Sequence, residues 1–324
     1  MCKIKQIPED FVVKEIPTKE FNEKIKDKGH YTYFILKKIN YNTEKAIQEL
    51  SDYFRIQRKW FGYAGNKDKI AITEQYCSVK AKIKNIRIKD IEVKVIGYGN
   101  EPISLGDLKK NYFEITVRNI DKKPKKLDKV INYFDEQRFG INKNNHLIGK
   151  DIIKGNFKEA INKILSNNPE LKDFIDKNPT NYIGTLRKLP KKILLLYIHS
   201  YQSYLWNKTV NEYLQCKYNS EEKIPIVGFG TEIKNKILKQ IIEDIMKEED
   251  ITYRDFIIKQ LPELSQEGSE RDLFVKVKDL KIGELEKDDL NPGKNKVKFS
   301  FYLDKGAYAT NVIKEIFRIA QTCQ

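Results

Sequence analysis

The order in which strand-like and helix-like stretches follow one another is the feature that most limits how this chain can fold. The first third carries short runs of aromatic and β-branched residues that predict strands. From about Asp151 onward, apolar residues recur at helical spacing instead, and strand patterns return after Gly268. This order predicts a mainly helical domain inserted into an α/β domain, so that both chain ends belong to the same domain.

The individual elements follow from the same patterns. Strands are predicted over residues 11–16, 31–38, 86–96, 112–117, 273–277 and 296–303, with a short strand-like run at 70–73. Helices are predicted after a cap at Asn42 or Thr43, and over residues 125–135, 157–165, 193–214, 233–246 and about 310–321. The aromatic residues on one face of 193–214 are more typical of a core than of a surface that stacks bases.

The composition is that of a globular protein. The 324 residues are 40% hydrophobic and 33% charged, and this length suggests two domains. No apolar run approaches the roughly eighteen residues of a membrane span, and the start lacks the apolar region of a signal peptide. We therefore expect a cytoplasmic protein with no membrane partner.

The net charge of +15 favours a polyanionic partner. Lysine and arginine number 61 against 46 acidic residues, and such a surplus suits a nucleic acid, whose neutralised phosphates release counterions. A lysine-rich proteome would give the same composition, so the charge supports RNA binding without establishing it.

The sequence lacks the motifs that bind metals and cofactors. No Cys-x-x-Cys pair occurs, and no histidine lies in a zinc-binding context. Neither the phosphate-binding loop Gly-x-x-x-x-Gly-Lys-Ser/Thr nor the dinucleotide fingerprint Gly-x-Gly-x-x-Gly is present. We expect no metal, no cofactor and no disulfide, with free thiols at Cys2, Cys77, Cys216 and Cys323.

A carboxylate between two lysines is the first candidate for chemistry. Asp68 lies between Lys67 and Lys69, after a glycine-containing loop and before the strand-like run. Two neighbouring ammonium groups favour the ionised form of a carboxylate, which can then act as a nucleophile or a base. The same residues are ordinary loop chemistry, so a solvated turn is the alternative.

Two further clusters can contact a nucleotide. Residues 132–140 combine aromatic rings that stack on bases with amides that hydrogen-bond to base edges. The alternative is a helix end that packs its phenylalanines into the core and stops at Gly140. In residues 303–310, Gly306 permits a tight turn and Thr310 can cap the last helix, while Tyr308 points into a cleft or into the core.

Together these clusters resemble the motifs of the TruD family of tRNA pseudouridine synthases. Five segments carry the likeness in the family's order: Lys5 with 8–15, then 65–75, 132–140, 199–207 and 306–310. The resemblance implies a pseudouridine synthase catalytic domain of the α/β (α+β) class, with a mixed, mainly antiparallel sheet, formed by residues 1–156 and 269–324. Residues 157–268 would form the family's inserted, mainly helical TRUD domain.

The resemblance also implies roles for single residues. Asp68 matches the catalytic aspartate, and Lys5 matches a lysine that neutralises it. Phe134 matches an aromatic residue beside the flipped uracil. The other residues that these motifs place at the substrate are Phe11, Lys67, Gln75, Asn132, Arg138 and Tyr308.

Two positions depart from the family's pattern. Asp135 stands where the family often has glycine, and Asp304 stands where it often has proline. Because a residue other than glycine holds a positive φ poorly, the first departure bears on the pose of Phe134. Neither departure removes a reactive group.

The implied reaction is the isomerisation of a uridine to pseudouridine, at uridine 13 of tRNA in this family. The N1–C1′ bond breaks, the uracil rotates and a C5–C1′ bond forms, so the enzyme is an isomerase that needs no cofactor. The implied partner is tRNA, and some members of the family use other RNAs. The competing interpretation is a noncatalytic RNA-binding protein, and the oligomeric state stays open, a monomer being compatible with the sequence.

Overall fold

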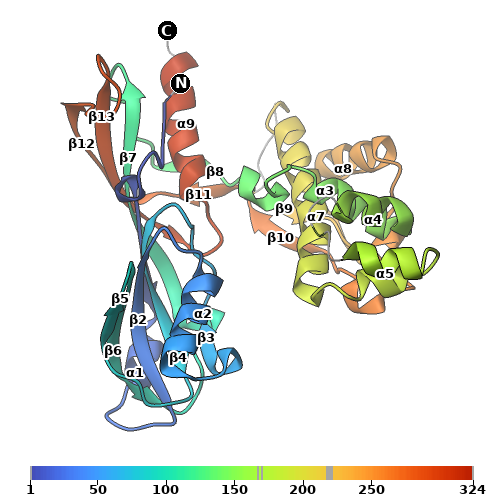
Figure 1. Cartoon of the computed structure of the whole chain (residues 1–324). Helices are drawn as coiled ribbons and strands as arrows, with labels where there is room; N and C mark the ends of the chain where they lie inside the picture. Colours follow the sequence, from blue (N-terminus) through green and yellow to red (C-terminus); the bar gives the residue numbers. More distant parts are fainter. Residues whose placement is uncertain (1, 166–167, 169–170, 217–221, 323–324) are drawn as a thin grey trace. The chain divides into compact units, whose positions relative to one another are not determined.

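The computed structural model describes residues 2–165, 168, 171–216 and 222–322. The chain divides into two compact units, of which unit 1 comprises Met1–Val130 and Val275–Gln324 and unit 2 comprises Ile131–Phe274. Figure 1 labels the elements of both units. The expected bounds of the family's insertion, 157–268, lie inside unit 2. The assignment of residues 157–268 to the inserted domain stays a prediction.

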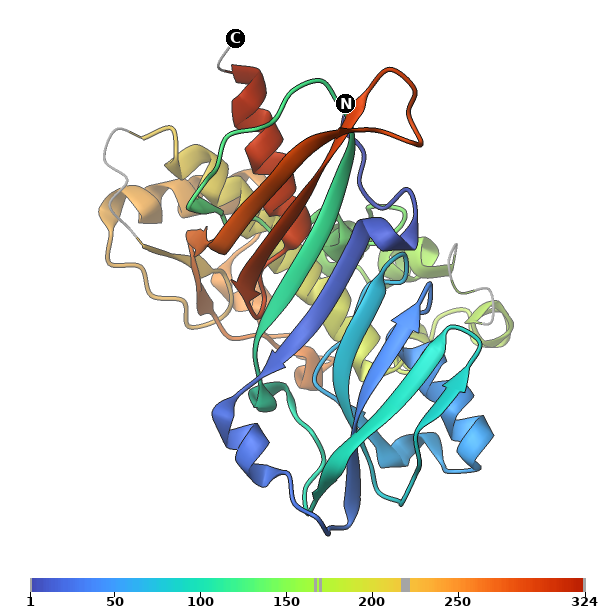
Figure 2. The same ribbon diagram turned by 90° about the vertical axis from the view of Figure 1, so that its left-hand side faces the viewer.

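Unit 1 is built on one large sheet, whose strands are seen side by side in Figure 2. Within the described residues the sheet has nine strands, in the spatial order β12-β13-β7-β1-β4-β2-β6-β5, with β3 paired to β4 off this path. All neighbouring pairs are antiparallel except β1 and β4, which run parallel. The predicted mixed, mainly antiparallel sheet is therefore confirmed. The strands are β1 (Phe11–Pro17), β2 (Tyr31–Ile39), β3 (Phe61–Tyr63), β4 (Ile72–Val79), β5 (Ile86–Ile88), β6 (Ile91–Gly99), β7 (Leu108–Ile120), β12 (Lys278–Lys287) and β13 (Asn295–Asp304).

In the described part of unit 1, the α-helices that accompany this sheet are α1 (Lys19–Lys24), α2 (Thr43–Phe54) and α9 (Ala309–Thr322). The helix α9 lies against one face of the sheet at β7 and β13, where its residues Val312 and Ile313 join the buried cluster around Phe301. The helix α2 is capped by Asn42, as expected, and its apolar face belongs to a second cluster on the same sheet. Tyr53 is not part of that face, because its side chain is 52% exposed.

One side of β4 is shared between two strands. The first half of β4 pairs with β1 as far as Glu74, and its last residues pair with β3 from Cys77 onward. The Tyr76 amide falls between these two ladders and donates to Glu15 Oε2 at 2.7 Å. A buried carboxylate therefore satisfies the backbone group that neither neighbouring strand reaches.

Unit 2 is mainly helical, and its long helix α7 packs against α3, α8 and β9. The aromatic side chains of α7 are buried in the core of the unit, Tyr201 and Trp206 completely, so the prediction of a core stripe is confirmed. The elements are α3 (Asn145–Ile153), α4 (Phe157–Leu165), α5 (Lys172–Lys177), α6 (Tyr182–Leu186), α7 (Lys191–Tyr213), α8 (Lys236–Glu248), β9 (Lys223–Ile226) and β10 (Ser269–Asp272). The chain passes between the units in the two short paired strands β8 (Lys129–Ile131) and β11 (Phe274–Lys276).

Three local predictions were wrong. Residues 125–135 form no helix, because they contain β8 instead. The single strand expected over 86–96 is a hairpin of β5 and β6, which turns at Lys89 with a φ of +50°. Finally, α9 begins at Ala309, so Thr310 lies inside the helix rather than at its cap.

The composition predicted no membrane span and four free thiols. In the part of the chain that the structure describes, no helix combines the length and the apolar character needed to cross a bilayer. Cys2, Cys77 and Cys216 are free thiols, whereas Cys323 lies outside the described residues.

Candidate active site

Asp68 lies in unit 1, on the loop between β3 and β4. Its Oδ2 atom is 3.2 Å from Nζ of Lys5, and the two side chains are 27% and 15% exposed. The same amine lies 4.1 Å from the centre of the Phe11 ring. Lys5, Phe11 and Asp68, which we call the aspartate cluster, thus form a half-buried ion pair over an aromatic ring, where a charge is screened less than on an open surface.

Lys38 supports this loop from inside the protein. It lies in the inward register of β2 with Phe34 and Leu36, and all three are 0% exposed. Its amine donates to the backbone carbonyl of Asp68 at 2.9 Å and to that of Tyr41 at 2.5 Å. Burial lowers the pKa of Lys38 to about 8, although the negative charge of Asp68 acts in the opposite direction.

Lys67 pairs with Glu15, although its place next to Asp68 in the sequence suggested a role beside that carboxylate. It forms an ion pair with Glu15, whose side chain is completely buried, while the side chain of Lys67 is 10% exposed. Burial raises the pKa of Glu15, and the charge of Lys67 opposes this shift. The contact of Lys67 with substrate stays a prediction, and its observed contact is with the carboxylate that also binds the Tyr76 amide.

Gln75 closes the loop that carries Asp68. Thr43 Oγ1 donates to Gln75 Oε1 at 2.9 Å and accepts from the Lys67 amide at 3.0 Å. The Gln75 Nε2 group donates in turn to the Gly65 carbonyl at 3.3 Å. The first and last residues of segment 65–75 are therefore joined, which fixes the backbone around Asp68 on both sides.

The second set of candidate residues lies in unit 2, and we call Asn132, Phe134, Arg138 and Arg271 the Asn132 cluster. Arg271 donates from Nε to the Asn132 carbonyl at 2.9 Å and from a terminal nitrogen to Asn132 Oδ1 at 2.6 Å. The Asn132 Nδ2 group donates to the Asp272 carbonyl at 3.0 Å. The side-chain amide of Asn132, which is 8% exposed, is thus oriented by neighbours from β10.

Phe134 is held from both its backbone and its ring. The side-chain amide of Asn207 accepts from the Phe134 N–H and donates to its carbonyl, both at 2.9 Å. The ring of Trp206 meets the Phe134 ring edge to face at 5.5 Å, and Arg271 Cζ lies 4.0 Å from its centre. Arg138 adds a hydrogen bond to Ser203 Oγ at 3.2 Å. The motif 199–207 therefore acts as the support of segment 132–138.

The two departures from the family's pattern are accommodated. Asp135 has a φ of −78°, a value open to any residue, so the replacement of glycine strains nothing at Phe134. Asp304 ends β13, and its carboxylate pairs with Lys278 at 2.7 Å. Tyr308 follows on the turn between β13 and α9, where Gly306 has a φ of +86°.

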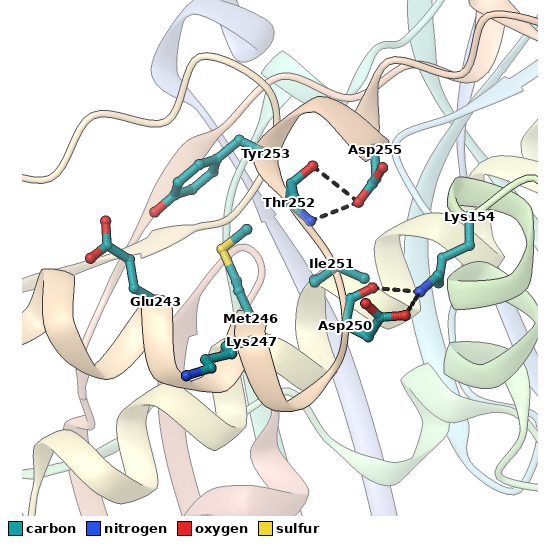
Figure 3. A pocket seen from close by; sticks show the side chains of 9 residues that line it. All are labelled: Lys154, Glu243, Met246, Lys247, Asp250, Ile251, Thr252, Tyr253 and Asp255. Atoms are coloured by element: carbon teal, nitrogen blue, oxygen red, sulfur yellow. Dashed lines mark hydrogen bonds and ion pairs between the residues drawn. The ribbon is translucent and has the colours of Figure 1, made fainter.

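A pocket of about 600 Å3 in unit 2 contains none of the predicted site residues. Figure 3 shows that Lys154, one of its two lysines, points to Asp250, with which it forms an ion pair, and that Asp255 accepts from Thr252. Four of its polar residues therefore bond to one another within the pocket lining. Among the described residues, no group of three or more His, Cys, Asp or Glu side chains could hold a metal ion.

A family model described as tRNA pseudouridine synthase D (TruD) matches residues 1–174, 170–224 and 218–316. The chain belongs to this family. The predicted family and the predicted enzyme class, an isomerase, are therefore confirmed. Membership also supports the predicted conversion of uridine to pseudouridine.

Individual relatives resemble the chain along nearly its whole length. The tRNA pseudouridine synthase D of Aquifex aeolicus is 30% identical, over 97% of this chain and 98% of the relative. A protein of Nanoarchaeum equitans named "Probable tRNA pseudouridine synthase D" is 33% identical over 97% of this chain and 98% of its own length. A crystal structure of a TruD protein from Methanosarcina mazei superposes with a TM-score of 0.72 at 27% identity, covering 98% of this chain and 93% of that one.

No sequence motif indicated the supporting roles of Glu15, Lys38, Thr43 and Arg271. One of them had a usable signal, because Lys38 falls on the inward side of a strand whose alternate residues are apolar, where a lysine needs a specific partner. The partners of the others lie far away in the sequence.

Proposed function

We propose that this chain isomerises uridine to pseudouridine in tRNA, with Asp68 as the catalytic carboxylate. The observation that carries this role is the 3.2 Å ion pair between Lys5 Nζ and Asp68 Oδ2 beside the Phe11 ring. Membership of the TruD family supports the reaction, and the names of the relatives support tRNA as the substrate. Uridine 13 is the target that the resemblance favours.

The chemistry requires one ionised carboxylate near the sugar and the base. Attack on C1′, attack on C6 and removal of a sugar proton each begin from a carboxylate without its proton. The Lys5 amine lies 3.2 Å from Asp68 Oδ2, so a positive charge stands beside the proposed carboxylate. Nothing is oxidised and no second substrate enters, so the residues of the chain and the bound RNA suffice.

Aromatic and amide side chains are proposed to contact the target nucleotide. The proposed contacts are Phe11, Asn132 and Tyr308, and Phe134 is the ring proposed to stack on the uracil. Stacking would offset the cost of taking a base out of its helix, roughly a few kcal/mol. Lys67, Gln75 and Arg138 are proposed to line the same substrate. The net charge of +15 supports an electrostatic grip on the tRNA backbone.

The decisive test replaces the carboxylate alone. Asp68→Asn keeps the size of the side chain and the backbone carbonyl that Lys38 binds. We expect this variant to fold and to bind tRNA, and to release no tritium from tRNA labelled at C5 of uridine. Asp27→Asn, at an exposed position of unit 1, is the matched control and should turn over normally.

Two results would contradict the proposal. Substantial tritium release by Asp68→Asn would remove Asp68 from the reaction. No tritium release by the wild-type protein, with tRNA binding intact in both, would favour the noncatalytic RNA-binding protein instead. Mapping of pseudouridine at single-nucleotide resolution in treated tRNA then tests uridine 13.

A further inference from the structure

Lys5 has an unfavourable backbone conformation for its residue type. Its φ is +58°, in the left-handed region that a residue with a Cβ atom adopts only when its surroundings hold it there. The turn directs the side chain to Asp68 and Phe11. Something outside the residue must therefore maintain this turn.

The chain is anchored on both sides of Lys5, two residues before it and directly after it. Before it, the Lys3 amide donates to the Arg118 carbonyl at 2.9 Å, and the Arg118 amide donates back to the Lys3 carbonyl at 2.8 Å. After it, the amides of Gln6 and Ile7 both donate to Asp10 Oδ2, at 3.1 Å and 3.3 Å. The turn is thus fixed by backbone pairing on one side and by a carboxylate on the other.

Both anchors involve Arg118, the first through its backbone and the second through its side chain. The Nε atom of Arg118 donates to Asp10 Oδ1 at 2.8 Å and to Oδ2 at 3.0 Å, so Asp10 keeps its orientation toward the turn. A terminal nitrogen of Arg118 donates to Asp288 Oδ1 at 2.9 Å and to Asp289 Oδ1 at 2.8 Å. The side chains of Arg118 and Asp10 are 4% and 1% exposed, so water does not compete for these bonds.

Asn291 adds a third connection to the same segment. Its Oδ1 accepts from Lys3 Nζ at 2.7 Å, and its Nδ2 donates to Gln6 Oε1 and to Asp288 Oδ2, both at 2.8 Å. Residues on both sides of Lys5 are therefore tied to the cluster around Arg118.

We propose that Arg118 is a positioning residue of the reaction, which fixes the turn at Lys5 from both sides and so holds the Lys5 amine against Asp68. This inference rests on the proposed roles of Lys5 and Asp68. Loss of an anchor would let residue 5 relax to a negative φ and carry its side chain away from the carboxylate. Because electrostatic affinity for a nucleic acid is summed over many phosphate contacts, we expect the change to affect turnover rather than binding.

A double-mutant cycle between Asp10 and Lys5 tests this role. Asp10→Asn preserves the shape of the side chain but weakens its bonds to Arg118 and to the turn. We expect kcat to fall about tenfold in the otherwise wild-type protein, a coupling typical of residues in one network, with KM for tRNA unchanged. In a Lys5→Ala background the same substitution should cost nothing further, because the residue it positions is gone.

The matched control is Asp289→Asn, which removes a carboxylate from the same guanidinium group at a side chain that is 57% exposed. Within the described part of the chain, the Asp289 carboxylate bonds to Arg118 and Lys296 rather than to the segment before β1, so this variant should leave kcat unchanged. Asn291→Ala is a milder second variant, which acts through Lys3 and Gln6 and should show the same dependence on Lys5. Far-UV circular dichroism verifies that each variant folds.

The outcomes separate the two claims. An equal loss of kcat from Asp10→Asn in both backgrounds would overturn the positioning role, because the effect would not pass through Lys5. A loss of kcat in Asp289→Asn as large as that in Asp10→Asn would overturn it as well. If Lys5→Ala alone turns over normally, the proposed role of Lys5 fails first, and the inference about Arg118 fails with it.

Discussion

The buried ion pair of Lys67 and Glu15 gives a prediction that separates structure from substrate binding. The Glu15 carboxylate has no exposed surface, and its two oxygens meet the Lys67 amine and the Tyr76 amide. Lys67→Met removes the positive charge that pairs with this carboxylate. Removing one partner of a buried ion pair costs about 3–5 kcal/mol, and we expect the free energy of unfolding of unit 1 to fall by that amount near neutral pH.

The pH dependence of the loss has a definite sign. Burial already raises the pKa of Glu15, and without Lys67 that pKa rises further. A carboxyl group whose pKa is raised on folding binds its proton more tightly in the folded state, so its contribution to stability is lost as pH rises through the folded-state pKa. The destabilisation of Lys67→Met should therefore be smaller at about pH 5 than at about pH 8.

Hydrogen exchange followed by mass spectrometry, on peptides from β1 and β4, reads the stability of unit 1 separately from that of unit 2. The double variant Glu15→Gln with Lys67→Met is the control, since a neutral amide can still accept from Tyr76, and it should recover more than half of the lost stability. A loss below about 1 kcal/mol in Lys67→Met, or no recovery in the double variant, would refute the reasoning. A raised KM for tRNA in the recovered double variant would show that Lys67 also contacts the substrate.

Three further predictions concern residues that support the two clusters. Lys38→Met leaves the carbonyls of Asp68 and Tyr41 without their donor and should lower the free energy of unfolding by about 1–3 kcal/mol. Because the pKa of Lys38 is lowered from 10.5 to about 8 on folding, the wild type should gain stability relative to this variant as pH rises between those values, which urea unfolding at several pH values measures. Arg271→Ala removes two hydrogen bonds to Asn132 and the cation beside Phe134. Single-turnover tritium release should therefore slow about tenfold while unit 2 stays folded. An unchanged rate would contradict the proposed role of Asn132. Thr43→Val removes the hydroxyl that bonds both to Gln75 and to the Lys67 amide. Hydrogen exchange in residues 65–75 should become faster, and the free energy of unfolding should fall by about 1–2 kcal/mol. Unchanged exchange would show that this hydroxyl does not fix the loop.

The sequence predicted well those elements whose period is strong and local. The helix at 157–165 has the bounds expected, and β1, β2 and α7 differ from their predicted bounds by a few residues at most. The failures have physical causes. The hairpin of β5 and β6 turns at Lys89, which supplies none of the usual glycine signal for a positive φ, so two strands looked like one.

The candidate site was predictable only in part. The resemblance identified Lys5 and Asp68, which are far apart in sequence, and the structure places them 3.2 Å apart. The pairing of Lys67 with Glu15 depends on the register between β1 and β4, which no local pattern encodes. The prediction of a helix over residues 125–135 followed from the Lys122-Lys123-Pro124 break before them, whereas the pairing of β8 with β11 decides the conformation of residues 129–131.

The place of β13 between β12 and β7 has a consequence for synthesis on the ribosome. The strand β7 pairs with β13 from Ile120 to Lys110, yet all of unit 2 is translated between these two strands. Until β13 emerges, one edge of β7 has unpaired backbone groups, and the apolar residues that α9 later covers are open to solvent. Unit 2 is contiguous, so we expect it to fold during this interval while the nascent sheet of unit 1 still needs protection from aggregation.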